Sequence, residues 1–243
     1  MYFPVLLPNI FNHPFTYQSD IKLKVGEYVQ VPFGKSTMTG VVWDQFEKKS
    51  DKKFHIKHIS RKINIKPLKI ETIKFLNWFS EYNLVPKGMC LKLHLLSGEC
   101  IVPLDDKEYE KYNKLEKKFF FKLSADQDKI LKEVLKNSKD FKVHLIQGTT
   151  GSGKTIVYFK AVEEKLKKGL QALILLPEIG LTSEFEKKFK EFFGFNAAVW
   201  HSGITPKRKK IIWSGLATGK IKVVIGARSS LFLPFKKIGI LVV

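Results

Sequence analysis

The octapeptide GTTGSGKT at residues 148–155 constrains the fold of this chain more than any other feature. It fits the pattern Gly-x-x-x-x-Gly-Lys-Ser/Thr, in which a glycine-rich turn joins a buried strand to a helix. An apolar run at residues 143–147 predicts the strand, and residues 156–168 have helical spacing with Gly169 as a C-terminal stop. The stretch therefore predicts a P-loop in a parallel sheet, against the alternative of a glycine-rich turn with an incidental lysine.

A P-loop needs these residue types for chemical reasons. Glycines let the backbone curl so that successive N–H groups point at phosphate oxygens, and the helix N-terminus adds partial positive charge. Lys154 is expected to reach the β- and γ-phosphates, and the Thr155 hydroxyl is expected to bind Mg²⁺, which makes both the candidate catalytic residues. The predicted phosphate contacts are Gly148, Thr149, Thr150, Gly151, Ser152, Gly153, Lys154 and Thr155.

The charge balance points to a polyanionic partner. The chain has 43 basic and 23 acidic residues and a net charge of +20. Since 40 of the 43 are lysines, an AT-rich coding bias is an alternative source of the excess. Lysine is a point charge suited to phosphates and poor at reading base edges, so the charge favours binding of a nucleic-acid backbone.

Cysteine usage and hydropathy limit the other classes. Only Cys90 and Cys100 occur, without a C-x-x-C pair, which excludes a disulfide framework or a Cys₄ zinc site within the chain. Reduced thiols indicate a cytoplasmic protein. No run reaches 18 apolar residues, so no membrane span and no membrane partner are expected.

The chain divides by its pattern of elements. Residues 1 to about 60 contain five short candidate strands, the last at residues 54–60, and helical spacing follows at residues 67–82. Residues 97–122 are charged and poorly patterned, which predicts a linker or small helix. From Ser124 onward, apolar strands alternate with amphipathic helices, which is typical of an α/β fold with a parallel sheet. The expected domains are 1–96 and 123–243, joined by 97–122.

Several polar residues have two interpretations. Gln127 completes a capping box with Ser124, and this reading is favoured over an adenine contact on spacing alone. Thr182, Arg228 and Ser229 each follow a predicted strand, where they are either caps and turn residues or contacts to a nucleic-acid backbone.

The N-terminal part offers a second candidate site. Phe15, Tyr17, Gly34 and Lys57 combine aromatic rings, a close-approach glycine and a cation, which suits the stacking of one base beside a phosphate contact. Ordinary strand aromatics are the favoured alternative when these residues are taken alone.

Taken together, the motifs resemble a known family. The series LSADQ, QGTTGSGKT, LLPEIGLT, WHSG, VVIGARSSLFLPF and IGILVV is similar to that of the PriA family of replication-restart DNA helicases, and VPFGK with a downstream W…Y helix extends the likeness over nearly the whole chain. The resemblance implies an α/β chain: a β-rich DNA 3′-end-binding domain, then a truncated RecA-like P-loop lobe with a parallel sheet.

The resemblance also implies a function. A member of this family is an ATP- and Mg²⁺-dependent 3′→5′ helicase that binds forked and single-stranded DNA, recognises stalled forks and works with primosome proteins and single-strand-binding protein. It implies that Gln127 contacts adenine and that Thr182, Arg228 and Ser229 lie on the DNA path. The 3′-terminal nucleotide would meet Phe15, Thr16, Tyr17, Gly34 and Lys57, with Thr16 standing where the family often has Asp.

The sequence also departs from the family pattern. Residues 97–122 are too few for the winged-helix domain expected there, and the chain stops just before the Walker B motif, D-E-x-H. The resemblance implies that the second lobe, its arginine finger and the zinc-binding cysteines would follow the Walker B motif. The expectation is thus the N-terminal portion of a helicase, with a non-catalytic fork-binding fragment that holds ATP without turnover as the alternative. A GTPase is disfavoured because no N-K-x-D motif occurs.

Overall fold

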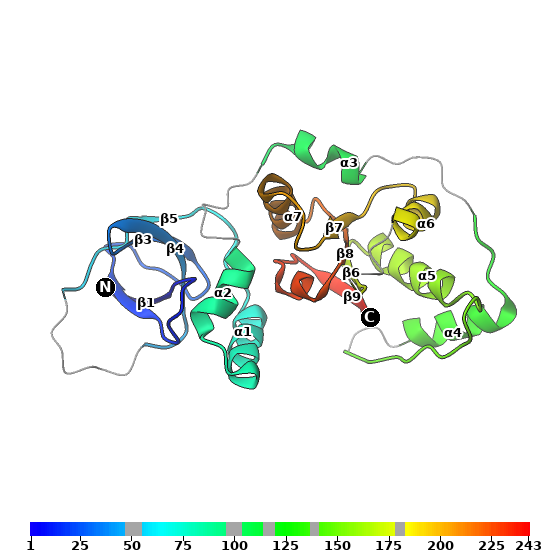
Figure 1. Ribbon diagram of the computed structural model, residues 1–243, viewed down its shortest axis with the longest axis horizontal. Coiled ribbons are helices and arrows are strands. Elements are labelled where there is room, and N and C mark those ends of the chain that lie inside the picture. The colour runs from blue at the N-terminus through cyan, green and yellow to red at the C-terminus, as the bar shows by residue number, and fades with distance from the viewer. Residues whose placement is uncertain (47–54, 96–103, 114–119, 137–140, 178–182) are drawn as a thin grey trace. The chain divides into compact units, whose positions relative to one another are not determined.

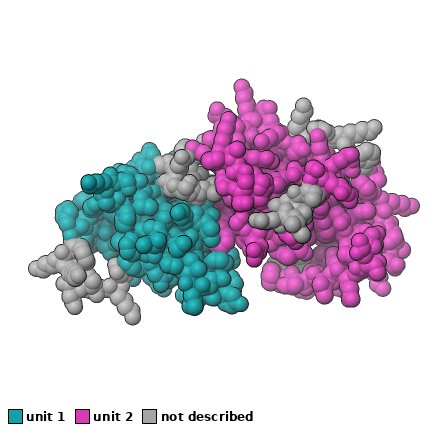
Figure 2. All heavy atoms as spheres, in the orientation of Figure 1, with its two compact units in different colours: residues 1–103 teal, residues 104–243 magenta. Residues whose placement is uncertain are grey.

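The computed structural model describes residues 1–46, 55–95, 104–113, 120–136, 141–177 and 183–243. The chain forms two compact units, residues 1–103 and residues 104–243 (Figures 1 and 2). Helices and strands are named as in Figure 1. None of the helices within the described ranges has the length and apolarity needed to cross a lipid bilayer.

The first unit is built on an antiparallel sheet of five strands in the order β2-β1-β4-β3-β5. Alternate side chains of the strands point to one face and form a core around Val5, Val29 and Val31, none of which is exposed to solvent. The strands are β1 (Tyr2–Leu6), β2 (Phe15–Gln18), β3 (Tyr28–Phe33), β4 (Ser36–Val42) and β5 (Arg61–Lys62).

The strand expected at residues 54–60 does not form in residues 55–60. His58 alone makes an isolated bridge with Gln18, and β5 begins at Arg61. Two hydrogen bonds, from Gln18 N to Lys57 O and from Ile59 N to Gln18 O, hold this segment beside the end of β2. This single bridge holds the segment beside β2, but no further backbone pairing extends it into a strand.

Two helices complete the first unit, α1 (Ile70–Asn83) and α2 (Lys87–Leu95). Ile73 and Leu76 of α1 are fully buried, as their spacing predicts, whereas Ile70 is 45% exposed. The unit also buries a polar pair, in which the Tyr28 hydroxyl lies 2.9 Å from His94 Nε2 and so connects β3 to α2. Buried polar atoms joined in this way fix the helix position specifically.

The second unit contains a parallel sheet of four strands in the order β7-β8-β6-β9. The predicted α/β class, with a β-rich first part and a parallel sheet in the second, is confirmed. The strands are β6 (Gln171–Leu175), β7 (Ala198–Trp200), β8 (Val223–Gly226) and β9 (Ile238–Val242). The longer helices are α4 (Ala125–Leu135), α5 (Lys154–Lys167), α6 (Ser183–Phe193) and α7 (Pro206–Thr218).

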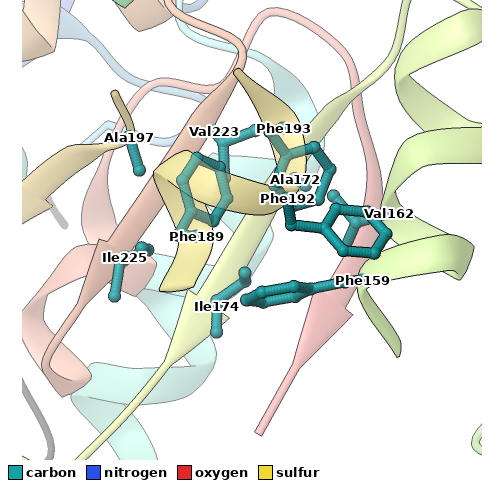
Figure 3. Close-up of a cluster of buried hydrophobic side chains, with 10 residues drawn as sticks. All are labelled: Phe159, Val162, Ala172, Ile174, Phe189, Phe192, Phe193, Ala197, Val223 and Ile225. Carbon is teal, nitrogen blue, oxygen red and sulfur yellow. The ribbon is translucent and has the colours of Figure 1, made fainter. Parts of the chain in front are cut away.

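A phenylalanine cluster packs α5 and α6 against this sheet (Figure 3). Phe159 of α5 lies 5.2–5.7 Å, centroid to centroid, from the rings of Phe189, Phe192 and Phe193 of α6. Ala172 and Ile174 of β6 form the floor of the cluster. The mostly edge-to-face and tilted contacts are the arrangements that aromatic rings prefer.

The strand predicted at residues 143–147 is not formed. Residues 141–149 are irregular, and the side chains of Val143 and Leu145 are 84% and 91% exposed. Only Ile146 packs, against a small cluster around Leu131 of α4 and Val157 of α5. The apolar pattern was read correctly, but a strand needs a neighbour for its backbone hydrogen bonds, and the described sheet places none beside this segment.

Part of the expected linker is ordered on the second unit. It contains the short helices η2 (Asp106–Tyr109) and α3 (Glu110–Asn113). Tyr109 is 1% exposed and donates a hydrogen bond of 3.0 Å to Ser214 Oγ of α7, while Lys220 Nζ lies 2.9 Å from Asp106 Oδ1. We call residues 104–113 the α7 brace.

Candidate nucleotide and DNA-binding sites

The predicted P-loop forms a tight turn into α5. Gly151 and Gly153 have φ values of +82° and +81°, and Gly153 is the N-cap of the helix. These left-handed conformations favour glycine. A Cβ on Gly153 would lie 2.4 Å from Nε2 of Gln127, so a larger residue there would displace the end of that side chain.

Lys154 points back into this turn. Its Nζ donates hydrogen bonds to the carbonyl oxygens of Gly148 (2.6 Å) and Thr149 (2.8 Å). Within the described residues, both hydrogen-bond acceptors of this ammonium are neutral oxygens. The loop therefore holds a cation whose charge is not balanced, which is the arrangement that fits a bound phosphate.

Thr155, the second residue of α5, is half-buried beside Tyr158. Burial raises the pKa of the Tyr158 hydroxyl, and a hydrogen bond with Thr155 partly opposes that shift. The Thr155 oxygen keeps lone pairs available for a metal. In the part of the chain that the structure describes, no group of three His, Cys, Asp or Glu side chains forms a metal site of its own.

Gln127 forms the predicted capping box and also contacts the P-loop. Its Oε1 accepts a hydrogen bond of 3.0 Å from Ser124 N, and Ser124 Oγ accepts one of 3.2 Å from Gln127 N, which completes the capping box of α4. In addition, Gln127 Nε2 donates a 3.1 Å hydrogen bond to the carbonyl oxygen of Ser152 in the P-loop. The structure thus brings Gln127 to the predicted phosphate contacts.

The candidates for the DNA path follow the strands of the parallel sheet. Arg228 and Ser229 are exposed in the first turn of the short helix η4 (Arg228–Phe232), directly beyond the end of β8. The next residue, Ser230, is buried and hydrogen-bonds the carbonyl of Ala227. Thr182 lies outside the described residues.

The candidate 3′-end residues divide between two sides of β2. Phe15 and Tyr17 face the core, where Tyr17 is 4% exposed and donates a hydrogen bond of 3.2 Å to Pro32 O. Burial raises the pKa of Tyr17 to about 12. Thr16 is half-buried and, by the alternation of a strand, points the other way. Tyr17 is therefore a core residue whose ring is not open for stacking on a base.

Phe15 belongs to an aromatic cluster that sequence reasoning missed. Its ring centroid lies 5.3 Å from those of Phe11 and Phe33 and 4.9 Å from that of His13. Gly34 follows Phe33 with φ of +59° and open space around the position of its Cβ. These rings come from a loop and from β2 and β3, which are not neighbours in the sheet, so sequence spacing does not show that they meet.

Lys57, the cation of the predicted 3′-end site, is exposed. Its carbonyl oxygen accepts from the backbone of Gln18 at the end of β2. The structure therefore places Lys57 on the surface, in a segment next to β2.

Both units of the chain match models of known protein families. Residues 4–95 match the family model of the PriA 3′ DNA-binding domain, and residues 124–243 match that of DEAD/DEAH box helicases. The replication restart protein PriA of Rickettsia conorii is 35% identical over 241 residues, which are 98% of this chain and 36% of the relative. PriA of Helicobacter pylori (strain ATCC 700392 / 26695) is 32% identical over 231 residues, 95% of this chain and 34% of the relative.

The parallel sheet, the P-loop and these matches define a helicase-type P-loop protein with an N-terminal DNA-binding domain. The chain belongs to the PriA family of replication restart proteins and corresponds to its N-terminal portion. It spans about 36% of the length of the Rickettsia conorii relative.

Proposed function

We propose that this chain is the fork-recognition and ATP-binding part of an ATP-dependent 3′→5′ DNA helicase that restarts stalled replication in the cytoplasm. The observation that carries the proposal is the Lys154 ammonium, which the P-loop encloses with neutral carbonyl oxygens as its partners. A phosphate is the group that balances such a charge.

The nucleotide site assigns roles to particular residues. The glycines of residues 148–153 offer backbone N–H groups to phosphates, Lys154 binds the β- and γ-phosphates, and the Thr155 hydroxyl is a ligand of Mg²⁺. Mg²⁺-ATP supplies the phosphoryl chemistry when bound. Gln127 contacts adenine on one side and the P-loop carbonyl of Ser152 on the other, so it senses whether the loop holds a nucleotide.

The DNA contacts are of two kinds. Thr182, Arg228 and Ser229 bind the backbone of single-stranded DNA at the carboxyl edge of the parallel sheet, where ligands of such sheets bind. In the first unit, the sheet surface around Thr16, Gly34 and Lys57, with Phe15 at its margin, receives the 3′ end of a strand. Tyr17 supports this surface from inside.

We also propose the domain limits 1–96, 97–122 and 123–243, with a winged-helix domain reduced or missing between the two larger parts. Primosome proteins and single-strand-binding protein are the proposed protein partners. The limits of the two larger parts are supported by the family matches at residues 4–95 and 124–243, and the partners by the relatives that are named replication restart proteins.

An unwinding assay tests the function. The protein encoded by the full reading frame is mixed with a fluorescent forked DNA, with and without ATP, next to its Lys154→Ala variant. We expect ATP-dependent strand separation that the substitution abolishes while fork binding remains. Unwinding by the variant at the wild-type rate, or no unwinding by the wild-type protein on any fork, contradicts the proposal.

A further inference from the structure

Four consecutive cations surround the start of α7, and the predicted function does not use them. We call Lys207, Arg208, Lys209 and Lys210 the α7 cation cluster. Successive residues of a helix are about 100° apart, so four in a row ring the helix end instead of lying on one face. They encircle the backbone N–H groups of the first turn, which already carry partial positive charge.

This arrangement works against the stability of the helix. The first turn of α7 contains no acidic residue, and its cap is the neutral Thr205, whose Oγ1 accepts from Arg208 N at 3.3 Å. Two of the other long helices differ in this respect, because α4 and α6 have acids in their first turns, whereas α5, which begins at the P-loop, has none. Cations at a helix N-terminus are unfavourable unless an anion joins them.

The cluster lies at the edge of the sheet from which Arg228 also emerges. Strands β7 and β8 are parallel neighbours, and Ala227 N donates a hydrogen bond of 3.0 Å to Trp200 O where they end. The loop after β7 leads into α7, and Lys209 Nζ donates to Ser202 O of this loop at 3.4 Å. Both sets of cations therefore follow the carboxyl ends of two adjacent strands (Figure 1).

The described residues supply little negative charge to this cluster. Lys207 Nζ lies 3.9 Å from Glu108 Oε1 of the α7 brace, but its side chain is 80% exposed, and such pairs are weak. Nε of Arg208 is buried and has no hydrogen-bond acceptor among the described residues. A buried donor without an acceptor is uncommon in folded proteins, so the described residues leave this guanidinium incompletely hydrogen-bonded.

We propose that the α7 cation cluster binds successive phosphates of single-stranded DNA and extends the path predicted at Arg228 and Ser229. The proposal rests on the proposed helicase function. Three of the four cations are lysines, which suit phosphates and carry no fixed geometry for reading bases. The cluster therefore adds affinity for single strands of any sequence.

The test is a matched pair of triple variants in the protein encoded by the full reading frame. One is Lys207→Gln, Lys209→Gln and Lys210→Gln. The control removes the same charge from the end of α5, by Lys165→Gln, Lys167→Gln and Lys168→Gln. That end lies at the opposite edge of the sheet, because β6 begins just after it.

Binding to a fluorescent oligo-dT strand is measured by anisotropy over a series of salt concentrations. Each phosphate contact contributes about 0.7 to the slope of log affinity against log salt for single strands, so the α7 variant should lose up to about 2 from that slope. Its affinity near 0.1 M salt should fall about tenfold or more. A Lys→Arg version of the same triple variant should keep both slope and affinity.

The outcomes separate the two proposals. If the wild-type protein binds oligo-dT and the α7 variant keeps its slope, or loses no more than the control does, the cluster is not a DNA contact and the helicase proposal stands. If the wild-type protein does not bind the strand, both fail. Heat unfolding tests the electrostatic argument: the α7 variant should unfold at the same or a higher temperature, and a lower one assigns the cluster a structural role and overturns the inference.

Discussion

The amide nitrogen of Gln127 lies 3.1 Å from the carbonyl oxygen of Ser152, so the residue that closes the start of α4 also touches the P-loop. Capping of α4 and contact with adenine are the two interpretations of this glutamine, and the structure shows the first and brings the side chain beside the P-loop. Its Oε1 serves the cap, and its Nε2 serves the loop.

A pair of substitutions separates these two roles. Ser124→Ala and Gln127→Ala both break the capping box, and each should lower the free energy of unfolding by about 0.5–2 kcal/mol. Only Gln127→Ala removes the contact with Ser152, so only this variant should also bind ATP several-fold more weakly. Urea unfolding and calorimetric titration measure the two effects. Equal loss of ATP affinity in both variants would show that the contact with the loop is irrelevant.

Lys154→Ala should weaken binding of Mg²⁺-ATP by about ten- to a hundredfold, because hydrogen bonds to charged groups contribute about 1.5–3 kcal/mol each. Isothermal titration calorimetry measures the affinity directly. Lys167→Ala at the other end of α5 is the control and should leave it unchanged. If Lys154→Ala binds Mg²⁺-ATP as tightly as the control does, the assignment of residues 148–155 as a P-loop is wrong.

Thr16→Asp should make binding more selective for a free 3′-hydroxyl. A carboxylate accepts a stronger hydrogen bond from the hydroxyl than threonine does, and it repels a 3′-phosphate. Thr37→Asp on β4 adds the same charge to an exposed position of the same sheet and serves as the control. Titrations compare 3′-hydroxyl and 3′-phosphate strands. A wild-type protein that already rejects the 3′-phosphate completely would show that Thr16 is no handicap.

Acid should destabilise the first unit through Glu27. Burial acts to raise the pKa of this carboxyl, but hydrogen bonds from Lys62 Nζ and Lys24 N, with the charges of both lysines, lower it overall below 4.5. A carboxyl whose pKa is lower in the folded state stabilises the fold above its unfolded pKa, and this contribution is lost as pH falls through the folded value.

The urea midpoint should therefore fall less between pH 7 and pH 3 in Glu27→Gln than in the wild-type protein. Glu81→Gln changes an exposed carboxyl of α1 and is the control. If the wild-type protein and Glu27→Gln lose the same stability over this range, the Glu27–Lys62 pair does not contribute to the acid sensitivity.

Phe159→Ala should be among the most destabilising substitutions in the second unit. The ring is 2% exposed and contacts three buried phenylalanines of α6, and truncation of such a side chain costs about 3–5 kcal/mol. Phe195→Ala, at the partly buried margin of the same cluster, should cost clearly less. Urea unfolding followed by circular dichroism gives both values, and similar losses would mean that the cluster is packed loosely.

Sequence patterns predicted the second unit well because most of its signals are local. The start of α4 follows from Ser124 and Gln127, and the start of α7 follows from Thr205 and Pro206. The apolar runs at β6, β8 and β9 predicted strands that are present. These features need only neighbouring residues to form.

The failures concern relationships between distant residues. The pattern at residues 143–147 is strand-like, but strand formation depends on a neighbour that no local pattern reveals. The stacking role of Tyr17 was implied by the family resemblance, whereas the interpretation favoured on the residues alone, an ordinary strand aromatic, agrees with its burial. The contact of Phe11, Phe15 and Phe33 likewise joins a loop residue to two strands that are not neighbours in the sheet.

The α7 brace bears on how the helicase lobe is produced for study. A fragment cut at residue 124, where the helicase family match begins, would lack Tyr109 and Tyr112, which are 1% and 3% exposed. The surface of α7 that Tyr109 covers, including the Ser214 hydroxyl, would then be exposed to water. Expression vectors for the lobe should accordingly start at Leu104, so that aggregation of a shortened fragment is not mistaken for a property of the enzyme.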